Sequence, residues 1–227
     1  MSQALLLKLR SELKLAADLK RAPAMQRYMK SAMPYHGVTG PLQKQIHRKV
    51  FAELQFRDSD VWKNAVLHVF RNAKFREEWY AAIALCEWKK AAQFQMPDAL
   101  GMYEEMIVTA AWWDVVDALA SHSVGALLRA YPNPIGKRMR AWSRDENMWK
   151  RRTSIICQLG SKKETNLDLL YGCIEPSLDS KEFFLRKAIG WALRQYAWTD
   201  SGEVRRYVKE NEKRLSPLSC REALKNL

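Results

Sequence analysis

Helical periodicity runs through nearly the whole chain, and this feature restricts its fold more than any other. Apolar residues recur at intervals of three and four positions, and runs that alternate apolar and polar residues are nearly absent. The 9 glycines and 8 prolines lie mostly between the periodic segments, where they break helices. The sequence therefore predicts an all-α protein of many short helices. The predicted helices span residues 3–20, 22–33, 41–56, 59–72, 76–94, 97–110, 113–122, 124–131, 135–145, 147–159, 165–175, 181–198, 202–211 and 217–226.

A recurrence of about 35 residues suggests how these helices are arranged. Three segments each place an aromatic residue three positions before an equivalent site, and these sites are Ala82, Arg152 and Lys187. The missing member of the series is Asp117. Helix pairs repeated at this interval are typical of HEAT-type solenoids, in which neighbouring pairs stack to bury a shared apolar face. We therefore expect residues 117, 152 and 187 on one wall of an array. The alternative is a non-repeating helical bundle with a coincidental spacing.

The charge of the chain points to a polyanionic partner. Lys and Arg outnumber Asp and Glu by 38 to 25, which gives a net charge of +13. A compact protein with such an excess is attracted to polyanions, of which DNA and RNA are the usual ones. A generally basic protein, or one that binds acidic protein surfaces, is the alternative on charge alone.

The cysteines, the histidines and the N-terminal segment give no sign of a disulfide-rich, metal-binding, secreted or membrane protein. The four cysteines form no C-x-x-C pair, and the four histidines are scattered, so we expect reduced, packed thiols and no metal site. Apolar runs are far shorter than a membrane span, and charges at residues 8, 10, 12 and 14 interrupt any signal-peptide core. We expect a cytoplasmic protein with no membrane contact.

One segment, Ala111–Asp117, carries a candidate catalytic carboxylate. Trp113 and Asp117 are four residues apart, so they share one face of a helix. Asp114 lies in the first turn, where a carboxylate commonly caps the helix or complements its dipole. Asp117 lies beyond that turn among apolar residues, so its carboxylate needs either an arginine partner or a cleft that is open to water. Spacing alone leaves a structural ion pair and a functional acid equally open.

A second segment mixes cations with an aromatic residue on one helical stripe. Lys187, Trp191 and Arg194 fall at i, i+4 and i+7. Core stripes do not contain lysine and arginine at such positions, whereas nucleic-acid surfaces do. Gly190 is unfavourable within a helix by about 1 kcal/mol relative to alanine. It therefore indicates close approach of a neighbouring helix or ligand.

Five segments in order resemble the AlkD-type alkylpurine DNA glycosylases, a family built from HEAT-like repeats. They are Arg27–Lys30, Trp112–Asp117, Asn147–Arg152, Ser180–Trp191 and Leu215–Ala223. The resemblance spans most of the chain. It implies an all-α curved solenoid of stacked antiparallel helix pairs with a basic concave face, forming one domain over residues 1–227.

The resemblance also implies the roles of particular residues. The active-site residues would be Trp113, Asp117 and Trp191, the phosphate-contacting arginine Arg152, and a further DNA-binding residue Tyr28. Four more cations are expected to bind DNA: Lys44, Arg48, Lys187 and Arg194. The chain departs from the family at Gly40, where a relative would have a threonine that contacts the DNA backbone.

The expected function is that of a monofunctional glycosylase acting on cationic N3- and N7-alkylpurines in double-stranded DNA. Asp117 would stabilise the sugar cation and orient water, and the indoles would face the cationic sugar and base. No cofactor is expected, and the protein would be a monomer that associates with the nucleoid when bound to DNA.

Two other functions remain open at this point. In a non-enzymatic HEAT-repeat scaffold for DNA or protein, Asp117 would only pair with a core arginine. In a bifunctional glycosylase, Lys187 would act as a Schiff-base lyase residue, which requires an uncharged amine. Whether Asp117, Trp113 and Trp191 point into one open cleft distinguishes the first alternative from a glycosylase.

Overall fold

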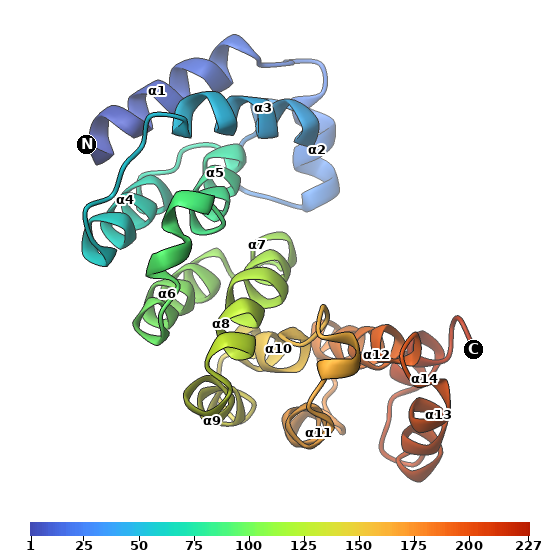
Figure 1. Ribbon diagram of the computed structural model, residues 1–227. Coiled ribbons are helices and arrows are strands. Elements are labelled where there is room, and N and C mark those ends of the chain that lie inside the picture. Colours follow the sequence, from blue (N-terminus) through green and yellow to red (C-terminus); the bar gives the residue numbers. More distant parts are fainter. The chain divides into compact units, whose positions relative to one another are not determined.

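The computed structural model describes all residues 1–227, and the chain is helical throughout with no strand. The prediction of an all-α fold is therefore confirmed (Figure 1). No helix combines the length and apolar composition that a membrane span needs. The fourteen α-helices are α1 (Ser2–Leu15), α2 (Ala22–Met29), α3 (Gly40–Phe51), α4 (Ser59–Arg71), α5 (Arg76–Cys86), α6 (Leu100–Ala110), α7 (Trp113–Ala118), α8 (Gly125–Ala130), α9 (Pro132–Trp142), α10 (Met148–Ile156), α11 (Leu167–Ile174), α12 (Phe183–Ala197), α13 (Ser201–Glu210) and α14 (Pro217–Ala223).

The chain packs into two compact units, Met1–Met102 and Tyr103–Leu227. In the first unit, α1 packs against α3, α4 and α5 through a stripe of four buried leucines at helical spacing, residues 5, 6, 9 and 13. The expectations of a single domain, and of one basic concave face shared along the chain, stay predictions.

The second unit is built from two layers of helices (Figure 1). One layer contains α7, α8, α10 and α12, and the other contains α9, α11 and α13. Consecutive helices pack against each other, as α8 on α9 and α9 on α10, and α10 also packs directly on α12. This is the arrangement expected of stacked helix pairs, and it brings the N-terminal turns of α7, α10 and α12 to one side.

Side-chain caps determine where several of these helices begin. Asn147 accepts hydrogen bonds from the backbone N–H groups of Trp149 and Lys150 at the start of α10. Asn166, Asp200 and Ser216 cap α11, α13 and α14 in the same way. Each cap satisfies backbone donors that have no partner within the helix. The register of α10, and with it the direction of Arg152, is therefore fixed locally by the sequence.

Several predicted helix boundaries are wrong. The helices expected over residues 113–122 and 124–131 form one continuous rod, in which a π-helical segment, Leu119–Val124, joins α7 to α8. No proline interrupts this stretch, so nothing forces the helix to end. Elsewhere, the predicted helix over 76–94 divides into α5 and a 3-10 helix over Lys89–Phe94, and α1 ends at Leu15 rather than near residue 20.

Gly125 allows the continuous rod to pack against its neighbour, and this predicts a measurable loss of stability. A Cβ at position 125 would lie 2.6 Å from the carbonyl oxygen of Cys157, which cannot move without shifting α10. We expect Gly125→Ala to lower the free energy of unfolding by about 1–3 kcal/mol, the usual range for overpacking. Denaturant unfolding measures this change.

Gly101 provides the matched control. It lies in α6, and a Cβ there would meet no atom within 4 Å. Gly101→Ala should therefore leave stability unchanged or raise it by up to about 1 kcal/mol. Equal effects of the two substitutions would contradict the close packing at Gly125.

Candidate active site

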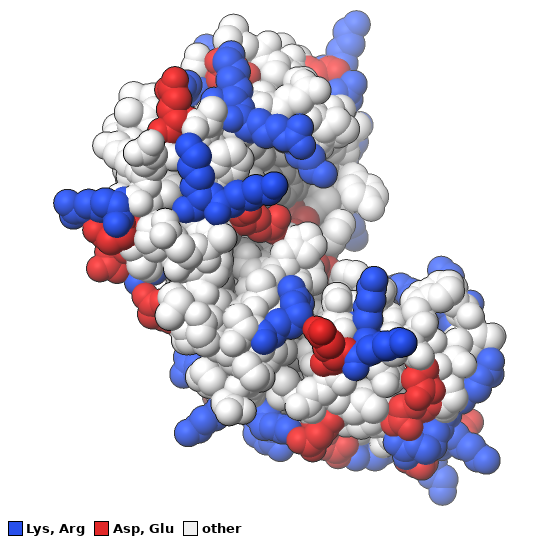
Figure 2. Space-filling model, in the orientation of Figure 1, with Lys and Arg blue, Asp and Glu red and all other residues white.

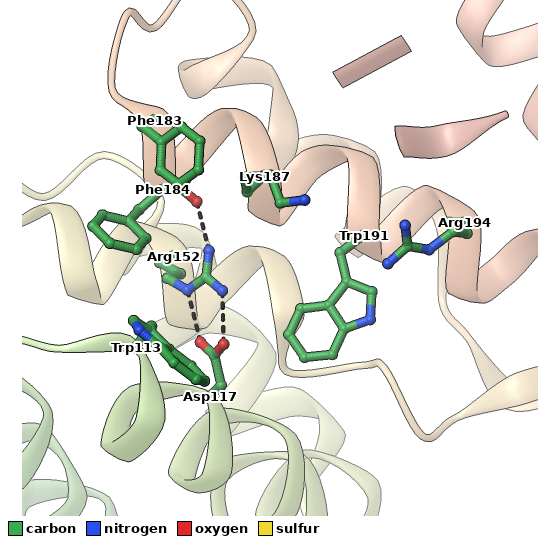
Figure 3. Close-up of a pocket in the computed structure, with 8 residues that line it drawn as sticks. All are labelled: Trp113, Asp117, Arg152, Phe183, Phe184, Lys187, Trp191 and Arg194. Atoms are coloured by element: carbon green, nitrogen blue, oxygen red, sulfur yellow. Dashed lines mark hydrogen bonds and ion pairs between the residues drawn. The ribbon is translucent and has the colours of Figure 1, made fainter. Parts of the chain in front are cut away.

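An open pocket in the second unit collects most of the residues predicted from the sequence. It has a volume of about 350 Å³. Its lining comes from α7, α10 and α12: Trp113, Asp117, Arg152, Phe183, Phe184, Lys187, Trp191 and Arg194 (Figure 3). The prediction that residues 117, 152 and 187 share one wall is confirmed. Trp113, Asp117 and Trp191 also meet in one cleft, which was the arrangement expected of a glycosylase.

A bidentate ion pair joins the two central residues of the pocket. The Nε and Nη2 atoms of Arg152 donate to Oδ1 and Oδ2 of Asp117, each at 2.7 Å. The Nη1 atom donates to the carbonyl oxygen of Phe184 at 2.6 Å. The Arg152 side chain is only 5% exposed. Two parallel charge-assisted bonds fix the plane of the carboxylate, which is a strong geometric constraint.

Burial and pairing act on Asp117 in opposite directions. Its side chain is 15% exposed. Desolvation raises the pKa of the Asp117 carboxyl above its ordinary value, and the charge of Asp114 adds to this rise. The hydrogen bonds and positive charge of Arg152 oppose it. Arg152 is therefore the group that favours the ionised carboxylate in this partly dry site.

Aromatic side chains form the walls around this ion pair. In the view of Figure 3, the Asp117 carboxylate lies between the indoles of Trp113 and Trp191. Phe184 lies with its ring centroid 5.9 Å from the Arg152 guanidinium, and it packs edge-on against Trp112 at 5.5 Å. Trp112 thus belongs to the packed cluster behind the pocket, as expected from its position about 100° round the helix from Trp113.

The backbone around α7 is unusual where it presents these groups. Ala111 has a φ of +44°, in the left-handed region that is unfavourable for residues with a Cβ. This residue turns the chain sharply from α6 into Trp113, the first residue of α7. After Asp117 the helix widens into the π-helical segment, and the Ser121 hydroxyl donates to the Asp117 carbonyl at 2.6 Å. Strained backbone and π-segments of this kind occur frequently at functional sites.

Comparison with known proteins places this pocket in a family context. The family described as DNA alkylation repair enzyme matches residues 9–227, which is nearly the entire chain. The chain belongs to this family. A solved structure described as a predicted DNA alkylation repair enzyme from Enterococcus faecalis is 30% identical, covers 93% of this chain and 96% of its own, and has a TM-score of 0.80. No curated protein sequence matches.

Membership of the DNA alkylation repair enzyme family supports an enzymatic role in the repair of alkylated DNA, with DNA as the partner. The site's geometry is compatible with that role, because a carboxylate, aromatic faces and cations surround an accessible pocket. Such groups can stabilise a developing positive charge and bind phosphate in the same place.

The two other cations of this repair-enzyme pocket are also paired. Lys187 Nζ lies 3.0 Å from Oε1 of Glu222, and Arg194 Nη1 lies 2.5 Å from Oε2 of the same residue. Both lie on α12, on either side of Trp191, and Glu222 belongs to α14. Glu222, Phe183 and Phe184 were not among the site residues predicted from the sequence. The 35-residue recurrence could have predicted the pairing of Asp117 with Arg152. The next position of the same series, 35 residues after Lys187, is Glu222.

Three residues that the sequence predicts to bind DNA lie in the first unit, whereas the pocket lies in the second. Tyr28 is 77% exposed near the end of α2, and Lys44 and Arg48 are exposed on α3. Figure 2 shows many lysine and arginine side chains on the face drawn there, with acidic side chains among them. The DNA contacts of these three residues stay predictions, as does the phosphate contact of Arg152.

Proposed function

We propose that this protein is a monofunctional DNA glycosylase that hydrolyses the N-glycosidic bond of cationic N3- and N7-alkylpurines in duplex DNA. One observation carries the proposal. The Asp117 carboxylate, held in a fixed plane by Arg152, faces a pocket that is also lined by Trp113 and Trp191.

The reaction requires stabilisation of a sugar cation. Alkylation at N3 or N7 gives the purine a formal positive charge, so the bond from C1′ breaks with both electrons going to the base. The base leaves neutral, and the deoxyribose acquires oxocarbenium character. Water then forms the new bond to C1′ and releases one proton to solvent. A fixed carboxylate near C1′ stabilises this cation and orients the water.

Each group of the pocket has a place in this scheme. Arg152 favours the ionised form of Asp117 and holds its orientation. The indoles of Trp113 and Trp191 present electron-rich faces to the cationic sugar and base. Lys187 and Arg194 are the cations of the pocket that meet phosphate. The carboxylate is thus prepared before substrate binds, which is the condition for electrostatic catalysis.

The pocket holds no second carboxylic acid and no histidine among its lining residues. No carboxylic acid or imidazole is therefore placed to protonate a leaving base, and the enzyme would depend on a base that is already cationic. A neutral lesion would have to leave as an anion. Selectivity for alkylated purines follows from this absence of a general acid.

The two alternative functions fit the pocket less well. A scaffold accounts for the ion pair between Asp117 and Arg152, but it gives no reason for an open aromatic pocket around that pair. A lyase needs an uncharged amine at Lys187, whereas the ammonium of this residue lies against the Glu222 carboxylate.

Leaving-group selectivity tests the proposal. Wild-type protein should release 7-methylguanine and 3-methyladenine from methylated duplex DNA, and it should also release bulky N3 or N7 adducts that keep the positive charge. Duplexes that contain uracil or hypoxanthine should remain intact. Chromatography of the released bases measures both outcomes. Abasic products should stay uncleaved until alkali is added, as expected of a monofunctional enzyme.

Efficient release of uracil would contradict the mechanism, because that base must leave as an anion or receive a proton. Strict exclusion of bulky cationic adducts would contradict an open pocket. No release of any alkylated base would favour the non-enzymatic scaffold.

A further inference from the structure

The C-terminal helix α14 brings one carboxylate against two cations of the pocket. Oε1 of Glu222 pairs with Lys187 and Oε2 pairs with Arg194. The Glu222 side chain is only 13% exposed. Both ion pairs hold the pKa of this carboxyl below its ordinary value, so it is negatively charged at neutral pH. A single carboxylate thus bridges two cations, one oxygen to each, as two oxygens of a phosphate could.

Close packing fixes α14 in this position without help from the ion pairs. A Cβ at position 190 would lie 2.5 Å from the Cβ of Glu222 and 2.9 Å from the Ser219 carbonyl oxygen, so Gly190 permits the approach. The Ser219 hydroxyl donates to the Arg186 carbonyl oxygen at 3.0 Å, and Ala223 is fully buried. The sequence-based expectation of close approach at Gly190 is confirmed. The double ion pair is therefore not needed merely to attach the helix.

Every cation that lines the pocket is paired with a carboxylate in the free protein. Arg152 pairs with Asp117, and Lys187 and Arg194 share Glu222. Three cations thus face two carboxylates, which leaves a small positive excess at a pocket of a strongly basic protein. Affinity for undamaged DNA comes mainly from neutralisation of phosphates by free cations. A resident carboxylate that competes with phosphate lowers this non-specific affinity.

We infer that Glu222 is a specificity-determining residue: it occupies Lys187 and Arg194 when no DNA is bound, competes with DNA phosphate for them, and so weakens binding to undamaged duplex. The inference rests on the proposed binding of DNA at this pocket. Glu222 acts through the two cations and is a positioning residue rather than a catalytic one. Contacts made by a damaged nucleotide with the rest of the pocket offset the competition, whereas undamaged DNA lacks them.

Binding of Glu222→Gln to an unmodified duplex tests this inference. Glutamine keeps the shape of the side chain and removes its charge. We expect the Kd for unmodified duplex to fall at least about threefold in 0.1 M salt, and the plot of log K against log salt to steepen by about one unit, because one more phosphate is neutralised. Fluorescence anisotropy over a series of salt concentrations measures both quantities.

Two further variants separate competition from a general charge effect. Glu212→Gln makes the same charge change at an exposed residue outside the pocket, and it should alter the Kd by less than about 1.5-fold. Lys187→Met in the Glu222→Gln background restores the net charge of the pocket. It should return the affinity to within about twofold of wild type.

Weaker DNA binding of Glu222→Gln would mean that Glu222 orders Lys187 and Arg194 for phosphate instead of competing with it. If Glu222 only orders the two cations, Glu222→Gln will weaken binding and Lys187→Met will weaken it further, which would overturn the inference. Should Glu222→Gln fail to fold, Glu222→Asp decides the question, since the shorter carboxylate cannot reach both cations. Tighter binding of the aspartate variant supports competition, and equal or weaker binding refutes it.

Release of 7-methylguanine by wild-type protein is measured in the same experiment. The expected affinity changes without base release would contradict the proposed glycosylase function alone. Base release without the affinity changes would contradict only the role of Glu222.

Discussion

Asp117→Asn is expected to lower the rate of 7-methylguanine release by at least about tenfold, which corresponds to the loss of roughly 1.4 kcal/mol of transition-state stabilisation. Asparagine retains the size of the side chain but carries no negative charge to oppose the sugar cation. DNA affinity should not fall, because the phosphate-binding cations remain and Arg152 loses its carboxylate partner. Single-turnover release from a duplex with one 7-methylguanine measures the chemical step, and anisotropy measures binding.

Asp114→Asn is the matched control for this substitution. Asp114 lies in the same helix α7, three residues earlier, and does not line the pocket. We expect its release rate to stay within about threefold of wild type, since its charge has the smallest of the effects on the pKa of Asp117. A variant without Asp117 that releases 7-methylguanine at the wild-type rate would remove this residue from the catalytic role.

The folded state of the Asp117→Asn protein needs a separate measurement. The substitution leaves the almost fully buried Arg152 without its anionic partner, and breaking a buried pair in this way can lower stability by about 3–5 kcal/mol. Thermal unfolding and DNA binding show whether the variant remains folded at the assay temperature. Loss of base release together with retained binding is the result that identifies a catalytic group.

The fold was accessible from the sequence because its main determinants are local. Apolar periodicity, prolines between segments and capping residues such as Asn147 act within a few positions along the chain, and they predicted an all-helical protein. The recurrence of about 35 residues added one non-local statement. It placed Asp117, Arg152 and Lys187 together, because equivalent positions of stacked repeats face the same side.

The features that sequence reasoning missed depend on contacts between distant segments. Glu222 pairs with cations that lie 28 and 35 positions earlier. Its separation from Lys187 equals the recurrence, but an equivalent position does not show which side chains form ion pairs. The packing of the continuous rod against α10 depends on Gly125, where a Cβ would lie 2.6 Å from the Cys157 carbonyl oxygen. Spacing and propensity do not give distances between side chains, so the sharing of Glu222 by Lys187 and Arg194 could not be predicted.

Arg152 received the role of a phosphate contact from the family resemblance, and the structure adds a second role that can be tested against it. Three of its five N–H groups already bond to Asp117 and to the Phe184 carbonyl. Two N–H groups remain for a phosphate. The two roles predict different consequences when this side chain is replaced.

Arg152→Met should move the pH dependence of base release to higher pH. Asp117 must be ionised to act, and burial already raises the pKa of its carboxyl, while Arg152 opposes that rise. Without the Arg152 cation the pKa of Asp117 rises further. On acidification, the variant therefore loses activity at a higher pH than the wild type does. Base release should therefore fall more at pH 6 than at pH 8.5. Single-turnover rates across this range measure the shift.

Stability of the same variant should depend on pH in the opposite sense. A carboxyl whose pKa is higher in the folded than in the unfolded state destabilises the protein when it is ionised. Arg152→Met should lower the free energy of unfolding by about 3–5 kcal/mol at pH 8. Part of this loss should be recovered as the pH falls through the raised pKa of Asp117. Denaturant unfolding at several pH values measures the recovery, and the double variant with Asp117→Asn should show little of it.

Arg151→Met is the control, because the adjacent arginine bonds to the Ser177 hydroxyl and the Pro176 carbonyl and does not line the pocket. It should leave the pH profile of base release in place. If Arg152 acted only on phosphate, its replacement would lower affinity for all duplexes alike and reduce the salt slope by about one unit. The pH profile would then stay unchanged. A shifted profile with a nearly unchanged salt slope would instead identify Arg152 as the residue that keeps the Asp117 carboxylate charged.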